Sequence, residues 1–195
     1  MRYDRQMILP EIGEEGQRKL KQAKVLIVGV GGLGSPIALY LAGAGVGCIG
    51  LVDDDVVSIS NLQRQVLYSE KELGKPKAIC AAERLSALNS ETTSQPYPTR
   101  LTEENAQEII SQYDIVVDGC DNFPTRYLIN DICAKTGKVY VYGAICGFEG
   151  QVSVFHYGEE KNVSRDLYPD DEEMKRMPPP PKGVMGITPA VTGSI

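Results

Sequence analysis

The chain has 195 residues, a hydrophobic fraction of 42% and a formal net charge of −6, which suits one globular domain with the start of a second. No apolar run is long enough to span a bilayer and the first residues are no signal peptide, so we expect a cytoplasmic protein without a membrane partner. The acidic balance and the lack of a Lys/Arg-rich stripe argue against a nucleic-acid partner.

The first fifty-odd residues predict a parallel βαβ unit. Residues 24–30 form an apolar run that ends in glycine, as a buried strand does. Ser35 and Pro36 suit a helix start, and the glycines at 43, 45 and 47 suit its end. Residues 48–53 form the next apolar run. This order of strand, helix and strand is typical of parallel neighbours joined by a crossover helix.

The alternation of helices and strands continues to residue 157. Helices are predicted over residues 76–88, 103–112 and 125–137, and strands over 93–99, 113–119, 138–145 and 150–157. The last two strands are joined by a short loop, so they cannot be parallel neighbours. The predicted fold is α/β: a Rossmann-like, doubly wound, mostly parallel sheet with an antiparallel extension and an N-terminal helical arm.

After residue 157 the composition changes. Residues 158–183 are charged and then proline-rich, which predicts a long excursion over the surface. The last dozen residues are apolar, and Gly193 and Ser194 resemble the start of a helix. We therefore expect residues 1–157 to form the main domain. Residues 158–195 are expected to form the excursion and the start of a C-terminal portion that continues beyond Ile195.

The segment GVGGLG matches the G-x-G-x-x-G pattern of nucleotide-binding turns. Gly29, Gly31, Gly32 and Gly34 would let the backbone turn tightly and approach a phosphate, at the N-terminus of the following helix. Asp53 follows about twenty residues later at the end of a strand, where a carboxylate meets ribose hydroxyls. Together these features predict a nucleotide site. The alternative is a glycine-rich turn that packs closely and binds nothing.

Two acids lie at the end of the strand predicted over 113–119 and just beyond it. Asp118 and Asp121 are placed at the carboxyl end of that strand, where ligands of doubly wound sheets bind. Magnesium uses few protein carboxylates together with phosphate oxygens, so this pair favours a Mg²⁺ site. The alternative for Asp121 is the N-cap of the next helix.

Cations and amides occupy two further segments. Lys75 and Lys77 stand at the start of the helix predicted over 76–88, where the helix dipole disfavours cations, so an anion such as a polyphosphate is the expected partner. In SNLQRQ, Arg64 is a bidentate donor for phosphate oxygens, and Asn61 adds neutral hydrogen bonds. The alternatives are a solvated lysine and a surface connector with incidental polarity.

The cysteines and the single histidine limit metal chemistry. An odd number of well-spread cysteines in apolar runs predicts reduced, mostly buried thiols rather than disulfides. No C-x-x-C pair is present and the only histidine is His156, so a structural zinc site has too few ligands. The cysteines are Cys48, Cys80, Cys120, Cys133 and Cys146.

With these segments assembled, the chain resembles the ThiF/MoeB/HesA family, relatives of the catalytic domain of ubiquitin-activating enzymes. The resemblance runs over nearly the whole chain and is carried by RYDRQ, GVGGLG, DDDVVSISNLQRQVLY, GKPKA, VDGCDNFPTRYLIND and EGQVSVF. It implies ATP- and Mg²⁺-dependent adenylation of the C-terminal glycine of a small ubiquitin-like sulfur carrier protein, with release of pyrophosphate, by a homodimer. Residues 1–157 would be the nucleotide-binding adenylation domain, and the thiamine-branch carrier is favoured over the molybdopterin-branch carrier.

The resemblance also implies roles for single residues. Lys77 would stabilise charge at the α-phosphate, Arg64 would contact the triphosphate, Asp121 would bind Mg²⁺, and Arg5 would reach the active site of the partner subunit. These four form the implied catalytic set. The implied nucleotide-binding set is Gly29, Gly31, Gly32, Gly34, Asp53, Asp55, Ser60, Asn61, Leu62, Gln63, Arg64, Gln65, Lys77, Asp121 and Asn122.

The chain departs from the family pattern near its end. Members often carry a Cys-x-x-Cys zinc pair before a Leu-Tyr-Pro-like segment, and here Val163 and Asp166 hold those places. A further family cysteine, linked to carrier conjugation or sulfur transfer, would fall near Pro179 and is replaced. The sequence therefore predicts that structural zinc is absent and that no cysteine step occurs at that place.

Two other classes of function remain open at this point. A NAD-dependent oxidoreductase would use the glycine motif and Asp53, but it leaves Arg64, Lys77 and Asp121 unexplained. A non-catalytic scaffold that binds a ubiquitin-like tail has no use for a triphosphate site. Thermal stabilisation by a ligand separates these classes, because ATP with Mg²⁺ would shift the melting temperature of the enzyme and NAD would not.

Overall fold

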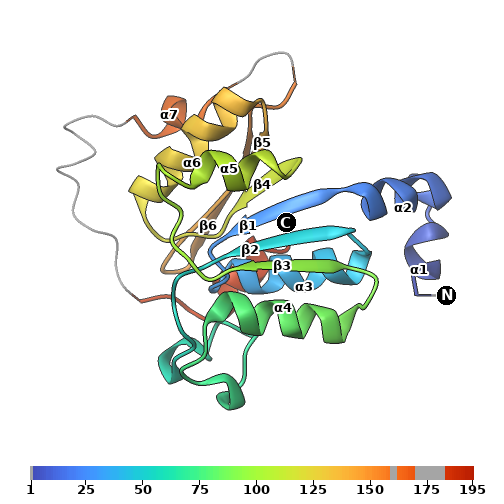
Figure 1. The fold of residues 1–195 in the computed structure, drawn as a ribbon, viewed down its shortest axis with the longest axis horizontal. Helices are drawn as coiled ribbons and strands as arrows, with labels where there is room; N and C mark the ends of the chain where they lie inside the picture. The colour runs from blue at the N-terminus through green and yellow to red at the C-terminus, as the bar shows by residue number, and fades with distance from the viewer. Residues whose placement is uncertain (1, 159–161, 170–182) are drawn as a thin grey trace.

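The computed structural model describes residues 2–158, 162–169 and 183–195 of the chain. At its centre is a six-stranded sheet with the order β3-β2-β1-β4-β5-β6 (Figure 1). Strands β1 to β5 pair in parallel, and β6 pairs with β5 in the antiparallel direction. This arrangement confirms the doubly wound, mostly parallel sheet and the antiparallel extension that the sequence predicts.

The strands are short and their apolar residues are buried. Four of the five residues of β1 are buried, because helices cover both faces of a central parallel strand and its sequence then becomes a continuous apolar run. The strands are β1 (Lys24–Val28), β2 (Cys48–Val52), β3 (Thr93–Tyr97), β4 (Ile115–Asp118), β5 (Val139–Cys146) and β6 (Glu149–Phe155).

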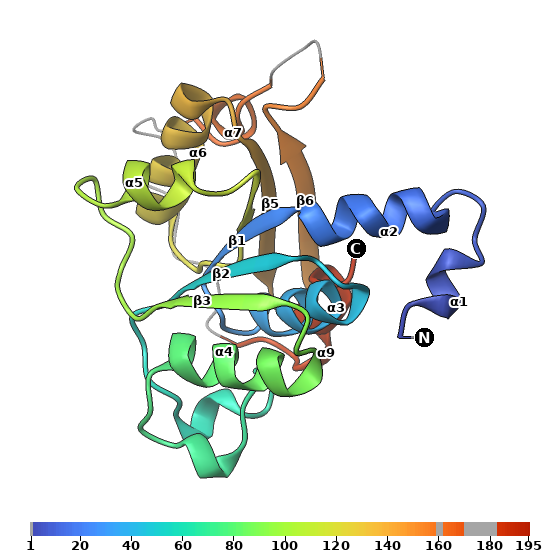
Figure 2. The ribbon, with the colours of Figure 1, turned by 45° about the vertical axis from the view of Figure 1, so that its right-hand side comes forward.

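Two pairs of helices cover the two faces of the sheet (Figures 1 and 2). Helices α3 (Gly34–Ala44) and α4 (Lys77–Leu88) lie on one face, and α5 (Ala106–Ser111) and α6 (Phe123–Thr136) lie on the other. Successive residues of β1 pack into the hydrophobic cores on opposite faces of the sheet, since side chains alternate along a strand. Ile27 packs in the core beside α3 and α4, and Leu26 packs in the core beside α5 and α6.

The N-terminal arm is helical, as predicted, and consists of α1 (Asp4–Met7) and α2 (Gly13–Gln22). Its hydrogen bonds reach the C-terminal ends of α3 and α4. Gln6 donates to the carbonyl of Ala44 at 2.8 Å, and Asn89 donates to the hydroxyl of Tyr3 at 2.9 Å. The arm is therefore anchored at the edge where the parallel strands begin, opposite the edge where they end (Figure 2).

Several predicted boundaries differ from the structure. The helix predicted from residue 103 begins at Ala106, because Asn105 accepts the backbone N–H of Thr102 and closes a turn before it. The prediction that Gly193 and Ser194 begin a helix is wrong. They follow α9 (Ile187–Thr192), and Gly193 donates its N–H to the carbonyl of Pro189 as the helix ends.

The surface excursion is described only in part. Helix α7 (Ser164–Leu167) packs beside α6, because the N–H of Ser164 donates to buried Asn130 at 3.0 Å and Arg165 pairs with Asp131 at 2.7 Å. The proline-rich run and the position near Pro179 lie outside the described residues.

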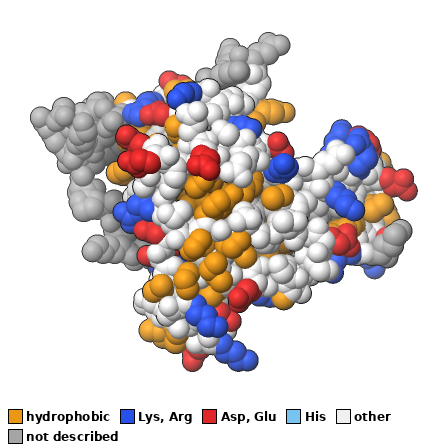
Figure 3. Space-filling model, in the orientation of Figure 1, with side chains coloured by type: hydrophobic (Ala, Val, Ile, Leu, Met, Phe, Trp, Pro, Cys, Tyr) orange, Lys and Arg blue, Asp and Glu red, His pale blue; other side chains and the backbone are white. Residues whose placement is uncertain are grey.

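The described surface shows mixed charge and no membrane-spanning helix. On the face drawn in Figure 3, acidic and basic side chains are interspersed, and hydrophobic side chains gather near its centre. Within residues 2–158, 162–169 and 183–195, no helix is both long and apolar enough to cross a membrane.

Candidate active site

The glycine-rich turn connects the end of β1 to α3. Gly29 has φ of 89°, and a Cβ there would lie 2.7 Å from the backbone of Gly119. A Cβ at Gly34 would overlap the carbonyl oxygen of Gly29. These two glycines are therefore required by the close packing of the turn itself. A Cβ at Gly31 would instead meet the side chain of Gln65, and one at Gly32 would meet the side chains of Pro189 and Arg64, so side chains rather than backbone adjoin these two positions.

Asp53 joins the end of β2 to the glycine-rich turn. Its Oδ2 accepts the N–H of Val30 at 2.8 Å, and its Oδ1 accepts the N–H of Asp55 at 2.9 Å. Burial raises the pKa of Asp53, and the hydrogen bond from Asp55 and the charge of Lys77 oppose that shift. Each carboxylate oxygen has a second lone pair, so Asp53 can also accept hydrogen bonds from a ligand hydroxyl.

The segment 60–65 begins within a short 3₁₀ helix, η1 (Ile59–Asn61), and lies against the glycine-rich turn. A Cβ on Gly32 would lie 3.6 Å from Cδ of Arg64, and one on Gly31 would lie 3.3 Å from Nε2 of Gln65. Gln65 is buried, and its Oε1 has no hydrogen-bond partner among the described residues. The side chains of Arg64 and Gln65 thus lie beside the glycine-rich turn.

The other predicted site residues of this segment are more exposed to solvent than Gln65. Ser60 and Gln63 are exposed, while Asn61, Leu62 and Arg64 are half-buried. The guanidinium of Arg64 donates to the carbonyl of Ser60 at 3.1 Å and makes no ion pair among the described residues. It is therefore held near the turn with donors to spare for an anion.

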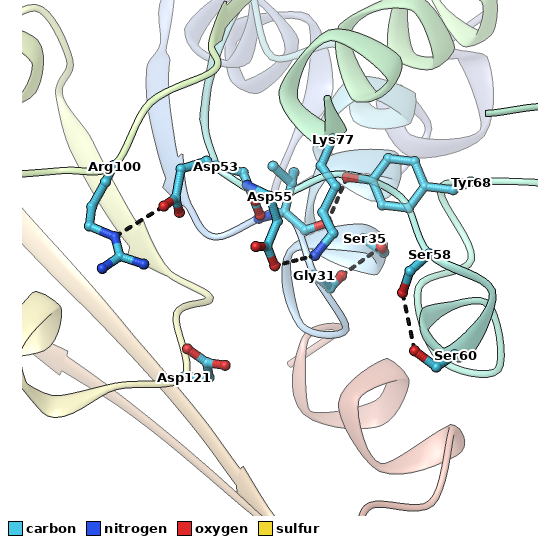
Figure 4. A network of polar contacts seen from close by, with 12 residues as sticks. Gly31, Ser35, Asp53, Asp55, Ser58, Ser60, Tyr68, Lys77, Arg100 and Asp121 are labelled. Atoms are coloured by element: carbon cyan, nitrogen blue, oxygen red, sulfur yellow. Dashed lines mark hydrogen bonds and ion pairs between the residues drawn. The ribbon is translucent and has the colours of Figure 1, made fainter. Parts of the chain in front are cut away.

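Tyr68 anchors this segment and was not predicted from the sequence. Its hydroxyl donates to the carbonyl of Val30 at 2.8 Å, and its side chain is buried (Figure 4). The position of the polar segment beside the turn therefore depends on a tyrosine that follows it.

Lys77 is the first residue of α4, as predicted. Its side chain is only 4% exposed, and its Nζ lies 2.8 Å from Oδ2 of Asp55, whose side chain is 72% exposed (Figure 4). The backbone N–H of Lys77 also donates to the carbonyl of Asp55 at 2.9 Å. A buried ammonium is costly without an anionic partner, so this contact stabilises the position of Lys77.

The last residue of β4, Asp118, and Asp121 in the loop that follows do not form the predicted pair. Asp118 is fully buried and accepts hydrogen bonds from Tyr140 at 2.7 Å and from the N–H of Cys120 at 2.9 Å. Burial raises the pKa of Asp118, and the nearby charge of Arg126 lowers it. Because these internal partners occupy its oxygens, Asp118 is a structural acid. Only the second acid remains available to a metal.

Asp121 is exposed and stands apart from the other labelled side chains in Figure 4. Its nearest polar contact is the amide of Asn122, at 3.4 Å. The alternative role as N-cap of α6 falls to Asn122 instead, because Asn122 Oδ1 accepts the N–H of Thr125 at 3.0 Å. Asp121 is thus free of the capping role.

Arg126 supports the loop that carries Asp121, and the sequence did not single it out. Its guanidinium donates to the carbonyl of Cys120 at 2.9 Å and to the hydroxyl of Tyr142 at 2.7 Å. Its Nε lies 3.7 Å from the carboxylate of Asp118. A charged residue on a predicted helix gives no local sign of burial, so only the packed fold reveals this role.

Arg5 is the one predicted catalytic residue that the single chain does not bring to this edge. It lies on α1, and the arm is anchored where the strands begin rather than where they end (Figure 1). Two hollows on the described surface also lie elsewhere. One is lined by residues that include Tyr3 and Glu91, and the other by residues that include Cys48 and Tyr113.

Possible metal ligands are few in the described part of the chain. It contains no cluster of three or more His, Cys, Asp or Glu side chains placed to hold a metal ion. Asp166, at one of the two family zinc positions, accepts the N–H of Val163 at 2.9 Å and so serves the first turn of α7. The five cysteines are free thiols, of which Cys80 and Cys133 are buried.

The chain is similar in sequence to known proteins along its whole length. The model of the ThiF family matches residues 3–195. The chain is 52% identical to the sulfur carrier protein adenylyltransferase of Thermus thermophilus, over the whole chain and 73% of that protein. It is 45% identical to the probable molybdopterin-synthase adenylyltransferase of Porphyra purpurea, over the whole chain and 51% of that protein. The chain thus spans between half and three quarters of these relatives.

A solved structure shares the fold over the full length of the chain. The crystal structure of E. coli MccB with MccA-N7isoASN superposes with a TM-score of 0.83 at 25% sequence identity. The match covers 100% of this chain and 61% of MccB.

Proposed function

Because the chain belongs to the ThiF family, we propose that it is an adenylyltransferase that transfers AMP from ATP to the C-terminal glycine of a small ubiquitin-like sulfur carrier protein. Relatives named as sulfur carrier and molybdopterin-synthase adenylyltransferases support this activity. One observation carries the proposal. The polar segment with Arg64 adjoins the glycine-rich turn, and the buried Lys77 pairs with Asp55, two residues after the Asp53 that accepts the N–H of Val30 in that turn. These residues lie at the carboxyl ends of parallel strands, where doubly wound sheets bind nucleotides.

The reaction needs positioning and charge more than proton transfer. A carboxylate oxygen of the carrier attacks the α-phosphorus, the bond between that phosphorus and the bridging oxygen breaks, and pyrophosphate leaves with the electron pair. The nucleophile is already an anion, so no protein base is required. Two anions must approach each other, so cations and N–H donors supply the main stabilisation.

Each segment of the site has a proposed part in this reaction. Gly31 and Gly32 would leave room for the phosphates beside the start of α3, and Asp53 would accept hydrogen bonds from the ribose hydroxyls. Arg64 would donate to the triphosphate, and Lys77 would stabilise charge at the α-phosphate. The remaining nucleotide contacts would come from the neighbouring residues Ser60, Asn61, Leu62, Gln63 and Gln65.

The residues present fit a nucleotide-bound Mg²⁺ rather than a metal held by the protein alone. Asp121 is an exposed carboxylate with Asn122 beside it, and the described residues offer no larger ligand cluster. One carboxylate with phosphate oxygens is a common magnesium environment. When bound, the ion would neutralise phosphate charge and orient the leaving group. We propose that the structural zinc of the family pattern is absent, because Val163 and Asp166 replace its first pair of ligands.

The proposed enzyme acts as a homodimer. The support is the position of Arg5, which the arm places away from the residues at the carboxyl ends of the strands of its own chain. Arg5 would then complete the active site of the partner subunit, as the family resemblance implies.

The choice of carrier separates two versions of the proposal. The thiamine-branch carrier is favoured by the resemblance of the sequence, and the relative from Porphyra purpurea provides the reason to test the molybdopterin-branch carrier. Isotope exchange between pyrophosphate and ATP, measured with each purified carrier, distinguishes them. Exchange that depends on a thiamine-branch carrier and disappears when its C-terminal glycine is removed supports the proposal. Exchange with the molybdopterin-branch carrier alone supports the second version, and no exchange with either carrier opposes both.

A further inference from the structure

The two partners of the ion pair between Lys77 and Asp55 differ strongly in solvent exposure. The lysine side chain is 4% exposed, and the aspartate side chain is 72% exposed. Lys77 Nζ lies 2.8 Å from Asp55 Oδ2, and no other ion pair of Lys77 is found among the described residues. The buried cation therefore depends on a carboxylate that solvent reaches easily.

Two hydrogen bonds hold the backbone of Asp55, whereas one contact holds its carboxylate. Its N–H donates to Asp53 at 2.9 Å, and its carbonyl accepts the N–H of Lys77 at 2.9 Å. The ion pair is the only hydrogen bond found for the Asp55 carboxylate among the described residues. A change of side-chain rotamer can therefore remove the carboxylate from Lys77 without disturbing the chain around it.

An anion that approaches Lys77 meets two opposing effects. The ammonium attracts it, and the carboxylate of Asp55 both repels it and occupies the donor that the anion would use. The neighbouring acid differs, because Asp54 pairs with exposed Arg100 at 3.1 Å and makes no contact with Lys77.

We propose that Asp55 is a stand-in anion: it holds Lys77 in place while the site is empty, and a phosphate group of the nucleotide displaces it. The inference rests on the proposed function, since it takes the displacing ligand to be an adenine nucleotide. Asp55 is thus a positioning residue for Lys77 before binding and a competitor of the phosphate during binding. Removal of the Asp55 charge tightens phosphate binding and lowers the stability of the ligand-free protein.

The test compares Asp55→Asn with Asp54→Asn, which removes the same charge from the adjacent residue. Binding of AMP and of adenosine is measured by calorimetry without divalent metal. We expect Asp55→Asn to bind AMP about tenfold more tightly than Asp54→Asn does, as for one charge-assisted hydrogen bond that no longer has to be broken. Adenosine, which has no phosphate, binds both variants equally. The melting temperature of ligand-free Asp55→Asn falls below that of Asp54→Asn.

Double variants separate competition for Lys77 from long-range effects of charge and from effects on folding. In a Lys77→Met background, Asp55→Asn gives no gain in AMP affinity over Asp54→Asn, because the cation that both anions compete for is gone. Equal tightening by the two single variants, or weaker AMP binding by Asp55→Asn, overturns the inference while leaving the proposed function intact. Failure of the wild-type protein to bind AMP or ATP opposes the proposed function itself, and the inference with it.

Discussion

Arg126 donates from Nη2 to the carbonyl oxygen of Cys120 at 2.9 Å, and Cys120 directly precedes Asp121. The same nitrogen lies 3.2 Å from the carbonyl of Gly143 on β5. One buried guanidinium thus connects the loop after β4 to the neighbouring strand, and it does so beside the fully buried carboxylate of Asp118. The position of the proposed magnesium ligand therefore depends on the hydrogen bonds of a guanidinium inside the protein.

Replacement of this arginine should be costly. Arg126→Met leaves Asp118 buried without its cation, and the expected loss is about 3–5 kcal/mol in the free energy of unfolding. Urea unfolding measures it. The matched control is Arg165→Met, which breaks the more exposed pair with Asp131 and should cost less than about 1 kcal/mol. Equal losses in the two variants would show that the buried pair has no special role in stability.

Arg64→Ala should slow adenylation by about a hundredfold or more, because the site loses a donor directed at phosphate charge. Carrier-dependent release of pyrophosphate provides the rate. Lys71→Ala removes an exposed lysine from the short helix η2 (Glu70–Glu72) and should leave the rate unchanged. A normal rate for Arg64→Ala would contradict the anion-binding role of the polar segment.

Mixed dimers test whether Arg5 acts across the subunit interface. Arg5→Ala and Asp121→Ala proteins should each be inactive alone, since one lacks the arginine and the other lacks the carboxylate proposed to hold Mg²⁺. A mixture should recover part of the activity, because one site of a mixed dimer keeps both residues. Differently tagged subunits verify that exchange has occurred. If exchange is complete and activity stays absent, Arg5 does not act in the partner's site.

Elemental analysis tests the expected absence of zinc. The purified protein should contain far less than one zinc per chain, and chelators should leave its melting temperature unchanged. Val163 offers no metal ligand, and the carboxylate of Asp166 is engaged with the N–H of Val163. Helix α7 is held instead by buried Asn130 and by the pair between Arg165 and Asp131. Stoichiometric zinc in the purified protein is the result that this account does not allow.

The order of the sheet and its helices was predictable because buried parallel strands appear as apolar runs bounded by glycine and aspartate. Lys77 was predictable at a helix start, because its charge opposes the helix dipole. The inward direction of Asp118 has a local signal in the sequence. It lies two residues after buried Val116, and alternate residues of a strand share a face.

Other features of the site depend on contacts between distant segments. Pro189 of α9 packs against Gly32, because a Cβ on that glycine would lie 3.2 Å from the proline side chain. Nothing in either local sequence indicates this contact. Likewise, the partners of Arg126 come from the loop after β4 and from β5, so its burial follows only from the assembled fold.

The proposed function requires the chain to activate a carrier carboxylate as an acyl-adenylate. Hydroxylamine trapping tests it most directly, because hydroxylamine converts an acyl-adenylate, but not a free carboxylate, into a hydroxamate. With ATP, Mg²⁺ and a thiamine-branch carrier, mass spectrometry should find the hydroxamate at the carrier's C-terminal glycine, and Asp121→Ala should abolish it. An unmodified carrier, in the presence of protein that is folded and binds ATP, would contradict the account.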